Sequence, residues 1–209
     1  MEFKTDQEFF WAGEFGDDYI ARNAAPELLA ANLALFSRIL RATSKVSSAV
    51  EFGANIGLNL RALHQLLPAI ELTGVEINSR AAAVLREWGG CEVHEGSILD
   101  YQPTKTVDLA FTKRVLIHIN PAELPSVYDL LFAASQRYVL IVEYYNPSPV
   151  EVTYRGESGK LFKRDFAGEF LDRFPTASLL DYGFAYRRDN SFSQDDLTWF
   201  LLEKKQIAS

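Results

Sequence analysis

The sequence has 209 residues, 48% of them hydrophobic and 23% charged, so it can bury a sizeable core in one domain and is not a disordered polyampholyte. Its 28 acidic and 21 basic residues give a formal net charge of −7, which argues against a nucleic-acid partner because such proteins present a basic surface. The single cysteine allows no disulfide within the chain, and no cysteine or histidine has the spacing of a zinc site, so we expect no metal. Neither a signal-peptide pattern nor an apolar run of roughly 18 residues is present. We therefore expect a cytoplasmic protein without a membrane partner.

Strand patterns and helix patterns alternate along most of the chain. Helices are expected at 26–40, 58–67, 79–88 and 121–134, after an aromatic-rich segment at 9–19. Strands are expected at 50–52, 71–75, 91–94, 107–112 and 138–143. The end of the chain carries two strand patterns without an intervening helix, at 178–187 and 197–202. The pattern predicts an α/β fold with a Rossmann-like, doubly wound sheet, mostly parallel with a C-terminal antiparallel hairpin at its edge.

A glycine loop, Glu51-Phe-Gly-Ala-Asn-Ile-Gly57, lies where the first strand turns into a helix. Gly53 permits a tight turn, Asn55 tolerates a positive φ, and Gly57 lets the helix pack closely. Glu76 follows the second strand, where a carboxylate can accept two hydrogen bonds from a ribose diol. These features predict a nucleotide-containing cofactor, with a ligand-free glycine turn as the alternative.

The spacing of the glycines separates two kinds of cofactor. A dinucleotide site needs G-x-G-x-x-G, and the pair Gly53 and Gly57 matches no pair in that triple. The loop instead resembles the first motif of class I S-adenosylmethionine-dependent methyltransferases, E/D-x-G-x-G-x-G, with Asn55 in place of the middle glycine. The segment Asp108-Leu-Ala-Phe-Thr-Lys-Arg-Val-Leu-Ile-His-Ile-Asn120 resembles the fourth-strand motif of the same class.

This resemblance implies S-adenosylmethionine as the cofactor and a set of residues around it. The loop would lie beside the methionine portion, and Glu76 would hold the ribose. Many members have Asp where this chain has Ser97, so the adenine contact could come from Ser97, a backbone group or Asp100. The cofactor-binding residues are expected to be Glu51, Gly53, Ala54, Asn55, Gly57, Glu76, Ile77, Ser97, Ile98 and Lys113.

The whole chain resembles the family of pseudaminic acid biosynthesis-associated methylases. The resemblance rests on strings such as Glu8-Phe-Phe-Trp-Ala-Gly-Glu-Phe-Gly16, Val115-Leu-Ile-His-Ile-Asn-Pro121 and Leu161-Phe-Lys-Arg-Asp-Phe-Ala-Gly168. It implies a methyltransferase acting on a small anionic metabolite, a sugar or nucleotide-sugar of nonulosonic acid type, but leaves the acceptor atom open. We expect one domain, 1–209, divided into a helical preamble (1–45), a cofactor-binding core (46–143), a substrate-binding insertion (144–175) and the hairpin (176–209).

Three kinds of residue are candidates for the acceptor side. His118 lies beyond the fourth strand, where an imidazole could act as the base for a hydroxyl, or could simply hydrogen-bond the backbone. Cations of the insertion could bind a carboxylate or phosphate, or could form a solvated charge run. Aromatic residues near the N-terminus could form a lid, or could simply pack on the core. The substrate-binding candidates are Trp11, Tyr19, Tyr144, Tyr145, Asn146, Arg155, Lys163 and Arg164.

Other functions stay open at this point. The acceptor could be an amino or carboxyl group of another polar metabolite, and the chain could be a cofactor-binding accessory protein without chemistry. An oxidoreductase is disfavoured by the incomplete glycine triple, and a nucleic-acid methyltransferase by the lack of an N/D-P-P-Y-type motif after the fourth strand. A homodimer is an open alternative to a monomer.

Overall fold

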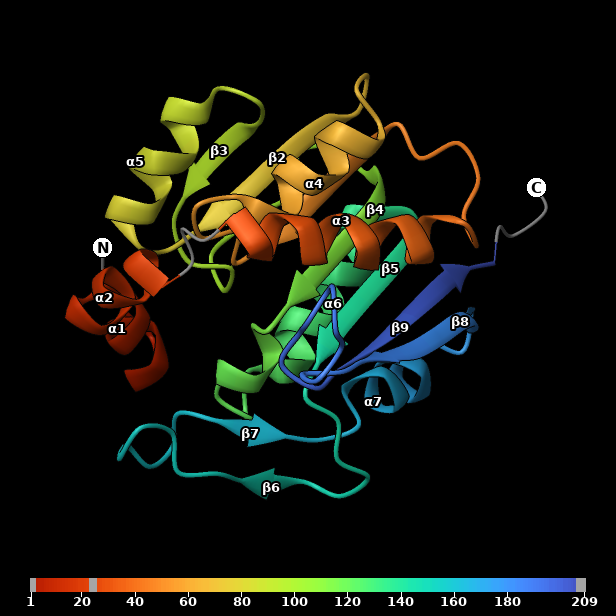
Figure 1. Ribbon diagram of the computed structural model, residues 1–209. Coiled ribbons are helices and arrows are strands. Elements are labelled where there is room, and N and C mark those ends of the chain that lie inside the picture. The colour runs from red at the N-terminus through yellow and green to blue at the C-terminus, as the bar shows by residue number, and fades with distance from the viewer. Residues whose placement is uncertain (1–2, 23–25, 206–209) are drawn as a thin grey trace.

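A seven-stranded sheet forms the centre of the computed structural model, which describes residues 3–22 and 26–205 (Figure 1). The strand order is β3-β2-β1-β4-β5-β9-β8, in which β1 to β5 run parallel and β9 pairs antiparallel with both neighbours. The strands are β1 Ser48–Phe52, β2 Glu71–Glu76, β3 Glu92–Glu95, β4 Val107–Lys113, β5 Ser135–Glu143, β8 Ala177–Ala185 and β9 Leu197–Lys204. The predicted α/β fold, with an antiparallel hairpin at the sheet edge, is therefore confirmed.

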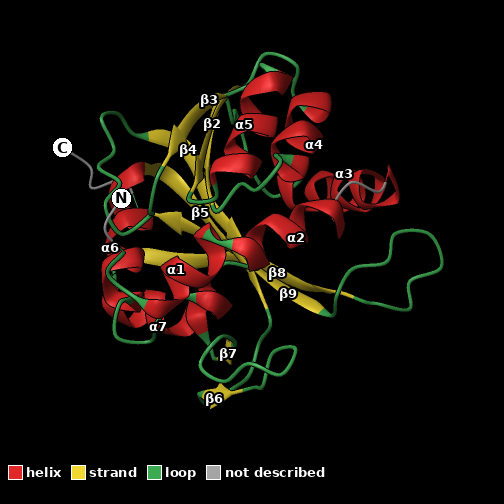
Figure 2. Ribbon diagram, turned by 90° about the vertical axis from the view of Figure 1, so that its left-hand side faces the viewer, coloured by secondary structure: helices red, strands yellow, loops and turns green. Residues whose placement is uncertain are grey.

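Helices cover both faces of the sheet (Figure 2). One face carries α3 Pro26–Leu40, α4 Leu58–Leu66 and α5 Ser79–Trp88, and the other carries α6 Leu124–Ala134 and α7 Phe166–Arg173. Each face has its own apolar core, with Phe36 and Leu63 buried on the first and Leu131 and Phe170 on the second. The near-continuous apolar run of β5 follows from this burial on both faces.

One predicted helix starts later than the sequence pattern suggested. The pattern placed its first residue at Pro121, whereas α6 begins at Leu124. Asn120 and Pro121 instead open a turn, in which Glu123 N donates to the carbonyl of Asn120 and Ala122 N donates to the Asn120 side chain. Asn followed by Pro is typical of the first two positions of such a turn.

Two segments outside the sheet complete the fold. The lid consists of α1 Asp6–Ala12 and α2 Glu14–Arg22, which lie across the carboxyl ends of the parallel strands (Figures 1 and 2). The arm, residues 144–164, extends from β5 and contains the short strands β6 Val150–Glu151 and β7 Phe162–Lys163. Within the described part of the chain, no helix has the length and apolar character needed to cross a membrane.

Candidate active site

The glycine loop follows β1 at the carboxyl edge of the sheet. Gly53, Asn55 and Gly57 have φ values of 78°, 48° and 80°. The expectation that Asn55 stands at a positive φ is thus confirmed. A Cβ on Gly57 would lie 2.3 Å from Leu85 Cδ1, so this glycine allows the close contact between the loop and α5. The backbone N–H groups of Gly53 and Ala54 both donate to the Val75 carbonyl, which ties the loop to β2.

Glu76, at the end of β2, holds the same loop from below. Its Oε2 accepts from Asn55 N at 2.6 Å and its Oε1 accepts from Asn78 N at 2.8 Å. Burial raises the pKa of this carboxyl, and the backbone hydrogen bonds oppose that shift. The backbone N–H of Ile77 also acts on this carboxylate, which has about four lone-pair sites and so keeps capacity for a further donor.

A second buried carboxylate, Glu51, lies at the end of β1. Asn59 Nδ2 donates to Glu51 Oε1 at 2.6 Å. Within the described residues, Glu51 Oε2 and Asn59 Oδ1 are buried without a hydrogen-bond partner. Burial raises the pKa of Glu51 to about 8 and lowers that of the nearby Lys113 ammonium to about 7. Asn59 Oδ1 can therefore accept from an ammonium group of a ligand, and a ligand carboxylate beside Lys113 would favour its charged, ammonium form.

A cavity opens over the carboxyl ends of β1, β2 and β4, between the sheet and the lid. It brings together eleven of the sequence-predicted residues, namely Trp11, Tyr19, Gly53, Ala54, Asn55, Glu76, Ile77, Ser97, Ile98, Lys113 and His118. Glu51 and Gly57, which were also expected to bind the cofactor, are not among the described lining residues. Residues that the sequence analysis did not single out also line the cavity, among them Gln7, Glu8, Asn32, Asn59, Arg114, Gln194 and Asp195.

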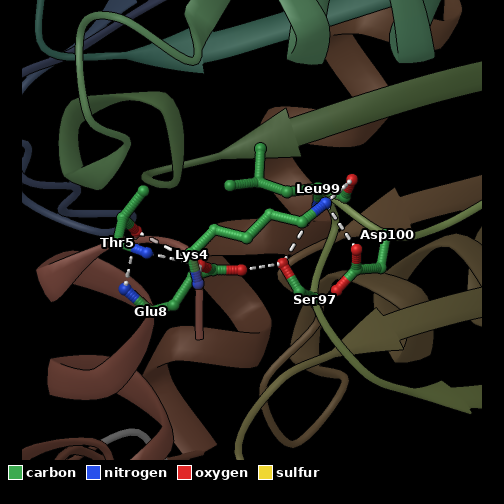
Figure 3. Close-up of polar contacts among 6 residues, drawn as sticks. All are labelled: Lys4, Thr5, Glu8, Ser97, Leu99 and Asp100. Atoms are coloured by element: carbon green, nitrogen blue, oxygen red, sulfur yellow. Dashed lines mark hydrogen bonds and ion pairs between the residues drawn. The ribbon is translucent and has the colours of Figure 1, made fainter. Parts of the chain in front are cut away.

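The lid is joined to the loop that follows β3 (Figure 3). The Ser97 hydroxyl donates to Glu8 Oε1, while Glu8 Oε2 accepts from the backbone of Lys4 at 2.6 Å and of Thr5 at 2.9 Å. Lys4 reaches across to Asp100, with a nitrogen–oxygen distance of 2.5 Å. Of the three adenine contacts considered from the sequence, Ser97 thus already bonds the lid, and Asp100 pairs with Lys4, just before the first lid helix. The Thr5-x-x-Glu8 capping box was the sequence signal for this helix start.

His118 lies in a short 3-10 helix, Leu116–His118, just after β4. Its Nδ1 is 2.6 Å from the carbonyl oxygen of Lys160 in the arm. The imidazole contacts two aromatic rings, with centroid distances of 4.5 Å to Trp11 and 5.1 Å to Tyr154. Burial is the main reason that the pKa of His118 falls to about 4. The histidine therefore makes the backbone contact that was one of the two roles considered from the sequence, and it also lines the cavity.

The arm residues predicted to bind substrate lie outside the described cavity lining. Arg164 Nε pairs with Glu169 at 2.7 Å, as the charge-run alternative anticipated. Arg155 is exposed over the Tyr154 ring, and Lys163 lies over the half-buried ring of Tyr144. Two further candidates complete the set: Tyr145 is exposed, and the Asn146 side chain bonds the Ser148 carbonyl.

Comparison with known proteins identifies the fold. No protein-family model and no curated protein matches the sequence. The structure is similar to that of the plantazolicin methyltransferase BpumL in complex with SAH, with a TM-score of 0.67 and 14% identity over 96% of this chain and 94% of that one. It is also similar to the magnesium protoporphyrin IX methyltransferase ChlM from Synechocystis PCC 6803 with bound SAM, with a TM-score of 0.69 and 10% identity over 98% and 100%.

A third similar structure is that of SAM-bound CalS10, an amino pentose methyltransferase from Micromonospora echinaspora, with a TM-score of 0.64 and 11% identity over 92% of this chain and 98% of that one. All three similarities extend over nearly the full length of both chains. The chain therefore has the fold of S-adenosylmethionine-dependent methyltransferases.

Proposed function

We propose that this protein is a methyltransferase that binds S-adenosylmethionine and acts on a small polar metabolite. The observation that carries the proposal is the position of Glu76, which braces the glycine loop through Asn55 N and lines the cavity beside it. Ligands of open α/β sheets bind outside the carboxyl ends of the strands, and an acid at this position suits a ribose diol.

The polar atoms of the cavity fit the rest of the cofactor. Asn59 Oδ1, which is unpaired among the described residues, lines the cavity and can accept from the ammonium of the methionine portion. The Lys113 ammonium, which lines the same end, can pair with the methionine carboxylate. Ser97 and Ile98, on the β3 side, are the candidates for the adenine end.

His118 is the residue that we propose as the base for a hydroxyl acceptor. When bound, the cofactor supplies a methyl group from a sulfonium, so the protein has only to align the acceptor and remove its proton. A carbonyl oxygen can only accept, so the contact with Lys160 requires a proton on His118 Nδ1 and leaves a lone pair on Nε2. With a pKa of about 4, the imidazole is neutral at pH 7 and able to take that proton.

We propose an anionic sugar or nucleotide-sugar of nonulosonic acid type as the acceptor. Three observations support this class: the family resemblance of the whole sequence, the rings of Trp11 and Tyr19 in the cavity lining, and the Arg114 guanidinium in the same lining. Aromatic rings cover the apolar face of a sugar, and cations bind its acidic group. The similarity to CalS10, whose acceptor is an amino pentose, is in keeping with a sugar.

A carboxylate acceptor is the second candidate. An imidazole with a pKa near 4 is a weak base, and a carboxylate that is already ionised at pH 7 needs none. Methylation of a hydroxyl would therefore depend on His118 as a base, whereas methylation of a carboxylate would not.

Two measurements test the proposed function. Calorimetry with S-adenosylhomocysteine should give saturable binding, and a labelled methyl donor should transfer its label to a sugar acid or nucleotide-sugar. Binding of NADH in place of S-adenosylhomocysteine would overturn the cofactor assignment while leaving the fold unaffected. Binding without transfer to any polar metabolite would favour the accessory-protein alternative.

A further inference from the structure

Arg114 is a strained residue in the wall of the cavity. It follows the last residue of β4 and has a left-handed φ of 58°, although it is not a glycine. Its N–H donates to the Val142 carbonyl of β5 at 2.9 Å, which fixes it between these two strands. Side chains held in this backbone region cluster at functional sites, because the surrounding structure must maintain the strain.

The ion-pair partner of Arg114 comes from the far end of the chain. Arg114 Nη1 lies 2.5 Å from Asp195 Oδ2, and the two side chains are 24% and 57% exposed. Asp195 belongs to residues 186–196, the connection between β8 and β9, which exceeds the roughly two to five residues usual for a hairpin. Gln194 Nε2 donates to Asn32 Oδ1 of α3 at 3.2 Å, and all four side chains line the cavity.

The sheet order places Arg114 on the acceptor side of the cavity. Glu76 lies at the end of β2 and the glycine loop follows β1, so the proposed cofactor extends from β2 across β1 towards β4. Arg114 lies beyond β4, next to β5, and lines the cavity near His118, because its charge acts on the imidazole that packs against Trp11. Trp11 Nε1 is buried without a hydrogen-bond partner among the described residues, which leaves a second donor for a ligand.

We propose that Arg114 binds the carboxylate or phosphate of the acceptor, and that Asp195 occupies its guanidinium until the acceptor displaces it. The guanidinium can form two parallel hydrogen bonds with either anion. The Asp195 carboxylate is more than half exposed, so its pairing with Arg114 is weak enough to exchange for a ligand held by further contacts. This inference rests on the proposed function, because it assigns the acceptor subsite of that reaction.

Inorganic phosphate is the probe that tests the anion site without knowledge of the acceptor. Equilibrium dialysis of labelled phosphate is performed on protein saturated with S-adenosylhomocysteine. We expect Asp195→Asn to bind phosphate about tenfold more tightly than the wild type, because a competing charge is lost, and Arg114→Gln to bind it about tenfold to a hundredfold more weakly. Arg173→Gln, which removes an exposed ion pair with Asp129, serves as the matched control and should equal the wild type.

Two results would overturn the proposal: phosphate binding that Arg114→Gln retains in full, or no gain in affinity for Asp195→Asn. The second variant keeps the test decisive if Arg114→Gln does not fold. Should S-adenosylhomocysteine fail to bind, the proposed function falls, and the same titration of the unloaded protein still tests Arg114. N-acetylneuraminic acid, compared with its uncharged methyl ester, then distinguishes a carboxylate site from a phosphate site: only a carboxylate site prefers the acid.

Discussion

His118 Nδ1 lies 2.6 Å from the carbonyl oxygen of Lys160, although 42 positions separate the two residues. The same stretch of the arm contacts the lid, because Lys160 Nζ donates to the Asp6 carbonyl and Gln7 Nε2 donates to the Gly159 carbonyl. The orientation of the imidazole therefore depends on the arm, and these hydrogen bonds join the arm to the lid.

The contact between Glu8 and Ser97 is expected to keep the lid closed over the cofactor. The Glu8 carboxylate accepts hydrogen bonds from the Ser97 hydroxyl and from the backbone of Lys4 and Thr5, and Glu8→Gln removes its charge. Hydrogen bonds to a charged group contribute about 1.5–3 kcal/mol, so we expect S-adenosylhomocysteine to bind about tenfold more weakly, as measured by calorimetry. Glu14→Gln, on the exposed side of the lid, is the control, and equal affinities for the two variants would contradict the closure.

Glu76→Ala should weaken binding of S-adenosylhomocysteine by about 2–3 kcal/mol, because the ribose loses its charge-assisted hydrogen bonding to this carboxylate. Part of the effect comes from the loop, since Asn55 N also loses its acceptor. A thermal melt without ligand measures that part separately. The control is Glu71→Gln, at the exposed opposite end of the same strand. Unchanged affinity for Glu76→Ala would remove the central cofactor contact.

The fold was predictable from the sequence wherever a segment carried its own signal. The pattern for α5 predicted both ends correctly, because Asn78 caps its start and Gly89 ends it in a left-handed conformation. The arm had no such signal, since β6 and β7 are two residues long and show no periodicity.

In the candidate site, too, only the contacts that belong to a local sequence motif were predictable. The glycine loop and Glu76 belong to a local motif, and the structure brings them together as the motif predicts. The pairs Glu8–Ser97 and Arg114–Asp195 join residues 89 and 81 positions apart. No local pattern encodes such contacts, because they arise only when the lid and the β8–β9 connection fold over the sheet. Four cations of the arm suggested an anion site, whereas the cations that line the described cavity are Lys113 and Arg114.

Glu143 should make the stability of the fold depend on pH. Its Oε1 accepts from the backbone of Val115 and Leu116, and burial raises its pKa from 4.5 to about 7. Between these values the folded state binds more protons than the unfolded state, so this group's contribution to stability is full below about pH 4.5 and is lost as the pH rises to about 7. The side chain of Glu143→Gln cannot ionise, so the variant does not lose this contribution as the pH rises. We therefore expect the free energy of unfolding of the variant, relative to that of the wild type, to increase between pH 5 and pH 8, as measured by urea denaturation. A difference between the two proteins that does not vary with pH would contradict the raised pKa.

The role of His118 separates the two candidate acceptors. If Nε2 removes the proton of a hydroxyl, His118→Ala should lower kcat by about 10²–10⁴-fold while S-adenosylhomocysteine still binds. The base must be neutral, so the wild-type rate should stay level down to about pH 5 and fall only as the pH approaches the lowered pKa of about 4. His94→Gln, at an exposed position of β3, is the control and should keep the wild-type rate.

A small loss for His118→Ala that does not vary with pH would favour a carboxylate acceptor, which depends on alignment alone. An acidic limb near pH 6.5 that His118→Ala abolishes would keep the histidine as the base and contradict its burial, whereas joint loss of activity and cofactor binding would assign it to holding the arm.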